Sequence, residues 1–161
     1  NNLLSQGEIR NIQIKGPNVF KGYWEMPEKT KEDFSKDGFF NTGDKGLIDE
    51  GGYVSIIGRS KDMIISGGLN VYPKEIESLI DKIEGVLESA VIGLSDEDLG
   101  EKVVAVIVSE ESKTLDEKKV ISEIKDQLAG FKAPKEVKFI DQLPRNAMGK
   151  VQKNILRETF S

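Results

Sequence analysis

The spacing of apolar residues changes once along this chain, near residues 58–62, and this change constrains the fold more than any other feature. Before it, apolar and polar residues alternate, as at Ile12 and Ile14. After it, apolar residues recur at helical spacing between residues 76 and 83. The chain therefore divides into two regions of different secondary structure, with a boundary near residues 58–62.

The second region is predicted to alternate helices with strands. Pro73 suits the first turn of a helix that Gly85 ends, and residues 114–117 have the form of a capping box for a helix that Gly130 ends. Further elements are expected as strands at 89–94, 102–108 and 136–140, and as a last helix after residue 150. The fold class is therefore α+β, with a β-rich region at residues 1–60 and a small domain at residues 61–161 whose helices flank a short sheet.

The absence of histidine and cysteine limits the chemistry of this chain. Thiol nucleophiles, disulfides, Cys/His zinc sites and histidine-based triads are excluded, and we predict no metal-ligand set. The net charge of −5 disfavours nucleic acid and anionic membranes as partners, although residues 131–157 are locally basic. No apolar run approaches the roughly 20 residues that span a bilayer, and the sequence shows no signal-peptide pattern. We expect a cytoplasmic protein, with which the lack of disulfides is compatible.

Residues 41–44, Asn-Thr-Gly-Asp, form the first of three polar segments that stand out against this scaffold. A carboxylate that follows a glycine turn at the end of a strand can accept hydrogen bonds from a ribose diol, as in dinucleotide sites. Asp44 is therefore a candidate nucleotide-binding residue. An ordinary loop turn is the simpler interpretation, since Asp after Gly is common in loops.

The second polar segment covers residues 58–62 and continues at residues 66–70. Arg59 could bind phosphate or ribose oxygens through two hydrogen bonds. Gly67 and Gly68 permit positive φ and a close approach of the backbone to a ligand. A connector between domains, with a glycine turn, is the simpler interpretation, and both can hold because hinges are found at such junctions.

The third polar segment, residues 144–150, ends on Lys150. A lysine that follows glycine on a loop before a helix can reach into the site of another domain and stabilise charge that develops on a phosphoryl group or a carboxylate. An exposed lysine without a special role is the simpler interpretation.

Five segments in one order, with matching flanks, resemble the C-terminal third of the adenylate-forming superfamily, which includes acyl-CoA ligases, synthetase adenylation domains and luciferases. The matching segments are residues 16–24, 39–44, 58–62, 67–77 and 144–150. The likeness extends from Gly7 to the end of the chain, and within the family it is strongest to malonyl-CoA synthetases. Many members carry Thr at one or more of positions 146–148, where this chain has Asn-Ala-Met.

The resemblance implies a role for each candidate residue. Asp44, Arg59 and Asn70 would bind the nucleotide, and Lys61 would be the hinge. Gly67 and Gly68 would lie beside the CoA thiol, and Lys150 would be the catalytic residue. Residues 1–60 would be the end of the β-rich, barrel-like subdomain of a large N-terminal adenylating domain. Residues 61–161 would be the small mobile C-terminal domain.

The reaction implied by the resemblance is ATP-dependent ligation of a carboxylic acid to CoA through an acyl-adenylate, with Mg²⁺ and with malonate as the favoured acid. Other acyl-CoA ligases, an adenylation domain that loads a carrier protein, and a binding module without catalysis are alternatives. The chain starts at Asn1 and lacks the phosphate-binding loop and the acid pocket of the family. We therefore expect a fragment that needs the N-terminal domain of the same enzyme as its partner and that is inactive alone. Acetylation of Lys150, controlled by a lysine acetyltransferase and deacetylase, would remove its charge.

Overall fold

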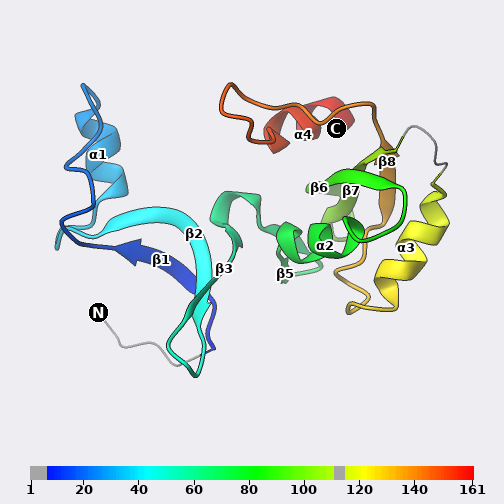
Figure 1. Ribbon diagram of the computed structural model, residues 1–161, viewed down its shortest axis with the longest axis horizontal. Coiled ribbons are helices and arrows are strands. Elements are labelled where there is room, and N and C mark those ends of the chain that lie inside the picture. Colours follow the sequence, from blue (N-terminus) through cyan, green and yellow to red (C-terminus); the bar gives the residue numbers. More distant parts are fainter. Residues whose placement is uncertain (1–6, 111–114) are drawn as a thin grey trace. The chain divides into compact units, whose positions relative to one another are not determined.

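The computed structural model describes residues 7–110 and 115–161, which fall into two compact units. Unit 1 ends at Lys61, and unit 2 runs from Asp62 to Ser161. Both units combine strands with helices, as Figure 1 shows. The predicted α+β fold class is therefore confirmed. No helix of the described residues is long and apolar enough to cross a membrane.

Unit 1 is an antiparallel sheet with one short helix. In chain order its elements are β1 (Arg10–Ile14), α1 (Pro27–Asp33), β2 (Phe40–Ile48) and β3 (Val54–Arg59), and the strand order is β1-β2-β3. Pro27 occupies the first turn of α1, where a backbone N–H is not needed. The rings of Phe20, Phe34 and Phe40 lie 5.0–5.5 Å apart between centroids, and this aromatic cluster packs α1 against β2.

Unit 2 is a mixed sheet with helices on both faces. In chain order its elements are β4 (Ile64–Ser66), β5 (Leu69–Val71), α2 (Pro73–Ile80), β6 (Val86–Asp96), β7 (Gly100–Ser109), α3 (Glu117–Lys125), β8 (Glu136–Phe139) and α4 (Lys153–Phe160). The strand order is β5-β4-β7-β6, and β8 pairs in parallel with β7. The centre of the sheet is the long antiparallel ribbon of β6 and β7.

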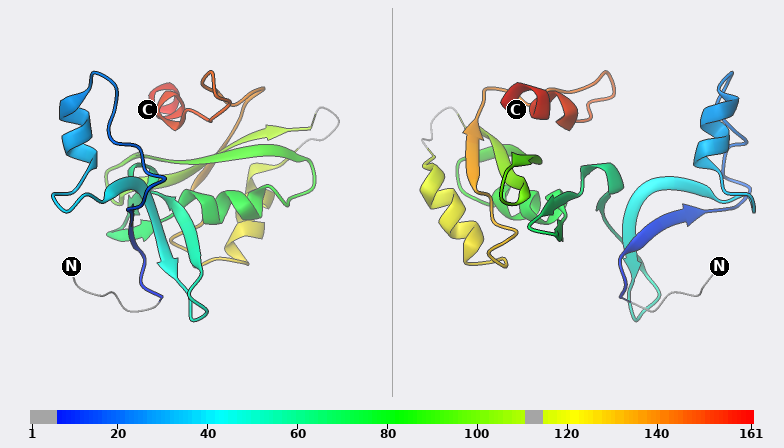
Figure 2. Two further views of the ribbon diagram at one scale, coloured as in Figure 1. Left: turned by 60° about the vertical axis from the view of Figure 1, so that its left-hand side comes forward. Right: turned by 180° about the vertical axis from the view of Figure 1, so that it is seen from behind.

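Two cores lie on the two faces of this ribbon. Alternate residues, among them Val91, Val103 and Ile107, face α2 and α3 and are fully buried. The residues between them, such as Ile92 and Val106, face α4. Figure 2 shows α4 on the opposite side of the sheet from α2 and α3. Because both faces are covered, β6 and β7 contain nearly continuous apolar runs instead of alternating ones.

In unit 2 the structure differs from the sequence predictions at four points. The β4–β5 hairpin was not expected, since strands of three residues are too short to give a periodic pattern. Helix α3 begins after Asp116, whose carboxylate accepts a hydrogen bond from the N–H of Lys119 at 2.9 Å, and the expected cap residue Thr114 lies outside the described residues. The predictions that Gly85 and Gly130 end the two helices are wrong. Helix α2 ends at Ile80 and α3 at Lys125, and the cap residues Asp81 and Asp126 are right-handed.

Glu136 of β8 pairs with two lysines, Lys138 of the same strand and Lys102 of β7. It accepts hydrogen bonds from Lys138 and from Lys102, whose Nζ lies 2.9 Å from Oε2. These hydrogen bonds, of which the one from Lys138 has the larger effect, hold the pKa of the Glu136 carboxyl below its usual 4.5. The stability that the ionised Glu136 contributes to the fold is therefore fully present above a pH of about 4.5, the pKa of the unfolded state. It is lost as the pH falls through the lower pKa of the folded state.

We expect Glu136→Gln to reduce the sensitivity of this chain to acid. Between about pH 5 and about pH 3, the free energy of unfolding should fall less steeply for the variant than for the wild type, because the titrating carboxylate is gone. Urea unfolding at a series of pH values measures this. Glu97→Gln is the control, because Glu97 is exposed and makes no ion pair with the described residues. Parallel curves for Glu136→Gln and the wild type would contradict the prediction.

Candidate functional site

Asp44 lies inside strand β2, and the prediction that residues 41–44 form a turn at the end of a strand is wrong. Three residues of β2, at positions 42–44, stand opposite the single β1 residue Ile12. Gly43 makes this bulge possible, because its φ of 76° lies in the left-handed region that glycine adopts without strain. A bulge turns the following side chain away from the regular alternation of the strand, and here that side chain is Asp44.

Asp44 and Arg59, two of the predicted nucleotide ligands, form an ion pair with each other. They are partners across β2 and β3, and Nε of Arg59 lies 3.1 Å from Oδ1 of Asp44. Nη1 of Arg59 donates to the carbonyl of Thr42 at 2.8 Å, so the guanidinium is fixed from two directions. Oδ2 of Asp44 and Nη2 of Arg59 make no hydrogen bond within the described part of the chain.

Lys61 is the last residue of unit 1. It lies in the short 3₁₀ turn Ser60–Asp62, directly after β3, and is exposed. Asp62 begins unit 2, and its Oδ1 lies 3.5 Å from Nη2 of Arg157 in α4. The residue predicted as the hinge therefore stands where one compact unit ends, and the next residue is already tied to the other unit.

Gly67 and Gly68 form the two-residue turn of the β4–β5 hairpin. Ser66 pairs with Leu69 on either side, and both glycines have positive φ, 57° and 77°, as a type I′ turn requires. A side chain at Gly68 would meet no atom within 4 Å. The turn is therefore glycine because of its backbone conformation, and its outer side is open. Asn70, in β5, is also exposed.

Lys150 ends a tight loop that Asn146 organises. The Asn146 side-chain oxygen accepts hydrogen bonds from the N–H groups of Met148 and Lys150, both at 3.0 Å. The backbone N–H of Asn146 donates to the Lys150 carbonyl at 2.9 Å, and Gly149 takes a positive φ of 76°. The Lys150 ammonium is exposed and makes no ion pair with residues 7–110 or 115–161. The loop is therefore ordered while its terminal charge stays available.

Unit 2 holds this lysine loop and the glycine turn near different ends of strand β6. Arg145, at the base of the loop, pairs with Glu88 near the start of β6. The N–H of Gly67 donates at 2.9 Å to the carbonyl of Leu99, which lies just beyond the end of β6. Asp96 lies eight positions after Glu88 in β6, which corresponds to roughly 26 Å of extended strand. The base of the lysine loop and the glycine turn therefore lie far apart along this strand.

Two residues that support the loop were not found from the sequence. Glu77 in α2 is buried, and its Oε1 accepts from the N–H of Val91 at 2.9 Å and from Lys153. Lys153 begins α4, three residues after Lys150. Glu77 lies on the apolar face of its helix, and a buried glutamate in that pattern was the only signal available.

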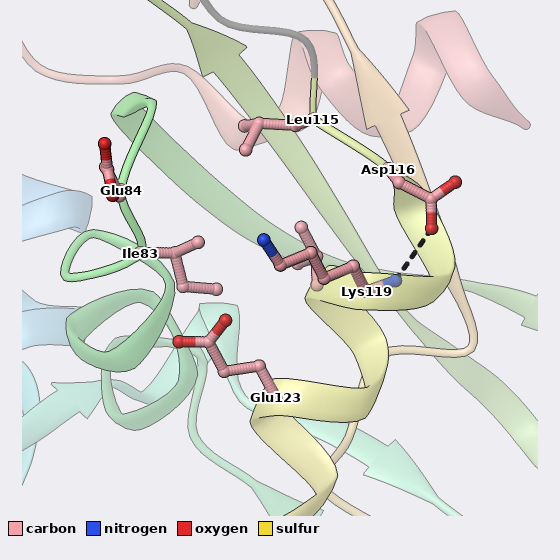
Figure 3. A pocket seen from close by; sticks show the side chains of 7 residues that line it. Ile83, Glu84, Leu115, Asp116, Lys119 and Glu123 are labelled. Carbon is pink, nitrogen blue, oxygen red and sulfur yellow. Dashed lines mark hydrogen bonds between the residues drawn. The ribbon is translucent and has the colours of Figure 1, made fainter.

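A cavity of about 480 Å³ lies elsewhere in unit 2, between α3 and the segment after α2 (Figure 3). Side chains of Ile83, Lys119 and Glu123 face one another across it. None of the candidate site residues lines it. The described residues also contain no group of three or more Asp or Glu side chains that could hold a metal ion.

The family of the chain follows from its fold and from its match to known proteins. Residues 75–150 match the AMP-binding enzyme C-terminal domain. This segment contains most of the unit 2 sheet, helices α2 and α3, and the loop that ends on Lys150. This segment is therefore an AMP-binding enzyme C-terminal domain, as found in adenylate-forming enzymes.

The individual relatives are CoA ligases for different acids. The chain is 49% identical over 152 residues to a methyl-dioxo-octahydroindenyl-propanoyl:CoA ligase of Rhodococcus jostii, covering 94% of this chain and 30% of that protein. It is 46% identical over 155 residues to indoleacetate–CoA ligase of Aromatoleum aromaticum, covering 96% of this chain and 30% of that protein. The crystal structure of ATP-bound MatB from Rhodopseudomonas palustris matches with a TM-score of 0.90 and 62% identity, covering 98% of this chain and 31% of that one. The chain thus spans about 30% of the length of the curated relatives.

Proposed function

We propose that this chain is the C-terminal part of an ATP-dependent acid–CoA ligase. Such an enzyme first joins the acid to AMP and then transfers the acyl group to the thiol of CoA. The names of the relatives support the reaction class, since they are CoA ligases. One observation carries the proposal. Unit 2 presents two separate elements, the ordered loop that ends on Lys150 and the open turn of Gly67 and Gly68. Two successive steps can each use one of these elements.

In the first step, an oxygen of the acid attacks the α-phosphorus of ATP and pyrophosphate leaves. The two reactants repel each other, since both are anionic, and the leaving group carries much negative charge. The Lys150 ammonium would lie between the carboxylate and the α-phosphate and reduce both penalties. Asp44 would accept hydrogen bonds from the ribose hydroxyls, and Arg59 and Asn70 would contact the nucleotide. Mg²⁺ would enter with the ATP phosphates and neutralise part of their charge.

In the second step, the thiolate of CoA attacks the acyl carbonyl, and AMP leaves. Gly67 and Gly68 would line the path of the pantetheine thiol, because a turn without side chains lets a narrow chain pass close to the backbone. Rotation of unit 2 about Lys61 would exchange the lysine loop for the glycine turn. Under this proposal the reaction takes place in the cytoplasm, where ATP and CoA are present.

Unit 1 would be the end of a larger β-rich N-terminal adenylating domain. It exposes large apolar side chains that a sheet of this size does not cover by itself, including Trp24 (87%), Tyr53 (75%) and Ile56 (65%). Exposed apolar groups in this number mark a surface that packs against other protein. The first partner of the chain would therefore be the rest of the same enzyme, which would supply the phosphate-binding loop and the acid pocket.

Malonate is the proposed acid. MatB is a malonyl-CoA synthetase, and its identity with this chain is 62%. This exceeds the 49% and 46% identity found with two ligases of larger acids. Because the relatives act on many different acids, the second candidate is an acyl-CoA ligase for another acid.

The full-length protein should be assayed for AMP formation with ATP, CoA and a panel of acids that includes malonate, acetate and a fatty acid. A clear preference for malonate supports the proposal, and a preference for another acid removes malonate while keeping the ligase. If AMP forms with an acid but transfer requires a phosphopantetheinyl carrier protein, the CoA ligase proposal fails.

We expect Gly68→Asn to block the second step selectively. Asparagine tolerates positive φ, and its side chain at this position would enter open space, so the turn should persist. In the full-length protein, the rate of acyl transfer from acyl-adenylate to CoA should fall at least about tenfold, since the side chain would obstruct the thiol. Acid-dependent pyrophosphate release should stay within about twofold of the wild type. Quench-flow measurement of the two half-reactions checks this.

Gly52→Asn is a matched control for that variant. Gly52 also has positive φ, 81°, and open space around its missing side chain, but it lies in the β2–β3 loop of unit 1. It should leave both half-reactions unchanged. If Gly68→Asn transfers the acyl group at the wild-type rate, the glycine turn does not lie on the path of CoA.

We also propose that acetylation of Lys150 regulates the enzyme. The ammonium is exposed on a loop that leaves it free of ion pairs within the described residues, so a modifying enzyme could reach it. Acetylation would remove the charge that the first step needs and would leave the second step intact.

A further inference from the structure

We propose that Glu101 is the positioning residue for the Gly67–Gly68 turn and that it supports acyl transfer to CoA without contacting either substrate. The inference rests on the proposed role of that turn in the second step. Glu101 is the second residue of β7 and lies outside the segments that pointed to function in the sequence.

The turn has few backbone hydrogen bonds to the rest of unit 2, although Ile64, Ser66 and Val71 of its flanking strands are buried. Strand β4 contains only three residues, and its pairing with β7 consists of one pair of residues, Ser66 and Gly100. The N–H of Gly67 adds a hydrogen bond to the carbonyl of Leu99. Two consecutive glycines also leave the turn with more backbone freedom than any other pair of residues. Such a turn needs an anchor outside itself to stay in one place.

The Glu101 carboxylate supplies that anchor. Its Oε2 accepts a hydrogen bond of 2.7 Å from the backbone N–H of Ile65, two residues before Gly67. A hydrogen bond from an N–H to a carboxylate is stronger than one to a neutral acceptor. The neighbouring Lys102 is directed to Glu136 instead. Glu101 forms no ion pair with the described residues, and its carboxylate is directed to β4.

Gly93 on β6 makes room for this contact. A Cβ added at Gly93 would lie 2.6 Å from Oε1 of Glu101 and 3.0 Å from Cγ2 of Ile64. The backbone of Gly93 does not require glycine, since its φ is not positive. Space is therefore the reason for glycine at this position, and the space is occupied by the carboxylate and by the first residue of β4. Gly93 and Glu101 act as a pair that holds one end of the hairpin.

The test measures the two half-reactions separately in the full-length protein. We expect Glu101→Ala to slow acyl transfer from acyl-adenylate to CoA about tenfold and to raise the KM for CoA, because the turn is no longer held in register. Pyrophosphate release should remain within about twofold of the wild type. Glu101→Gln should restore most of the transfer rate, since its amide oxygen can accept the same hydrogen bond. Glu97→Ala, on the adjacent turn, is the control and should change neither rate.

Gly93→Ala provides an independent test, because it should displace the carboxylate without removing it. We expect the same selective loss of transfer, and the double variant with Glu101→Ala should be little worse than either single variant.

Equal losses in both half-reactions, accompanied by a lower melting temperature, would overturn the proposal, since they indicate general destabilisation. If Gly68→Asn blocks transfer while Glu101→Ala does not, the positioning role is wrong and the proposed function stands. If neither variant affects transfer, the role of the turn in the proposed function is wrong as well.

Discussion

Replacing Lys150 by alanine in the full-length protein should lower acid-dependent pyrophosphate release by a factor of about 10² to 10³. The lysine is the charged group that the Asn146 loop presents, and its ammonium makes no ion pair with the described residues that would have to be broken first. In the first step it would compensate two negative charges that must approach each other. Removing it leaves their repulsion and the charge on the leaving pyrophosphate without that compensation.

The same variant should transfer a preformed acyl group to CoA at nearly the wild-type rate, because the second step would use the opposite end of strand β6. Lys135→Ala is the matched control, since Lys135 is an exposed lysine of unit 2 without an ion pair among the described residues. It should affect neither step. Acetylated Lys150 should behave as Lys150→Ala does. If complete acetylation, verified by mass spectrometry, leaves pyrophosphate release unchanged, neither the catalytic nor the regulatory role of Lys150 holds.

Replacing Glu77 by alanine should lower the free energy of unfolding by about 3 kcal/mol, the largest stability effect that we expect from a polar residue of unit 2. The side chains of Glu77 and Lys153 are only 10% and 15% exposed. The variant leaves the ammonium of Lys153 and the N–H of Val91 without their shared acceptor in a nearly dry environment. Because Lys153 begins α4, the loss should also loosen the loop that carries Lys150.

Denaturant unfolding of the chain measures this effect, and a double-mutant cycle with Lys153→Met separates the pair from its surroundings. The double variant should be more stable than Glu77→Ala alone, since no uncompensated buried charge remains. Lys74→Ala, on the exposed side of the same helix, is the control and should cost less than about 0.5 kcal/mol. A loss below about 1 kcal/mol for Glu77→Ala would show that water or another residue replaces the carboxylate.

The elements with a long apolar pattern were predictable from the sequence. Strands β6 and β7 and helix α2 were expected close to their observed positions, because each buries a regular set of side chains. The candidate residues came instead from short segments that resemble a family. They include Asp44 and Lys150, whose chemical type is visible in the sequence while their surroundings are not.

The supports of the site were not predictable, because they join residues far apart in the chain. Glu77 and Lys153 are 76 residues apart, and Ile65 and Glu101 are 36 residues apart. The bulge that turns Asp44 depends on pairing between β1 and β2, and the sequence suggested a turn at the same glycine. A local pattern contains the preference of a residue for helix, strand or turn, but it does not contain the partner that a side chain meets across a sheet.

The sequence by itself determined the α+β class, the place where apolar spacing changes and the types of residue that can do chemistry, because these depend on composition and on periods of a few residues. Only the tertiary structure decided that the lysine loop and the glycine turn lie near different ends of β6, and that buried or half-buried carboxylates hold them there. The physical reason is that hydrogen bonds and ion pairs between distant segments form only after the two faces of the sheet have been covered, so their geometry is a property of the packed unit.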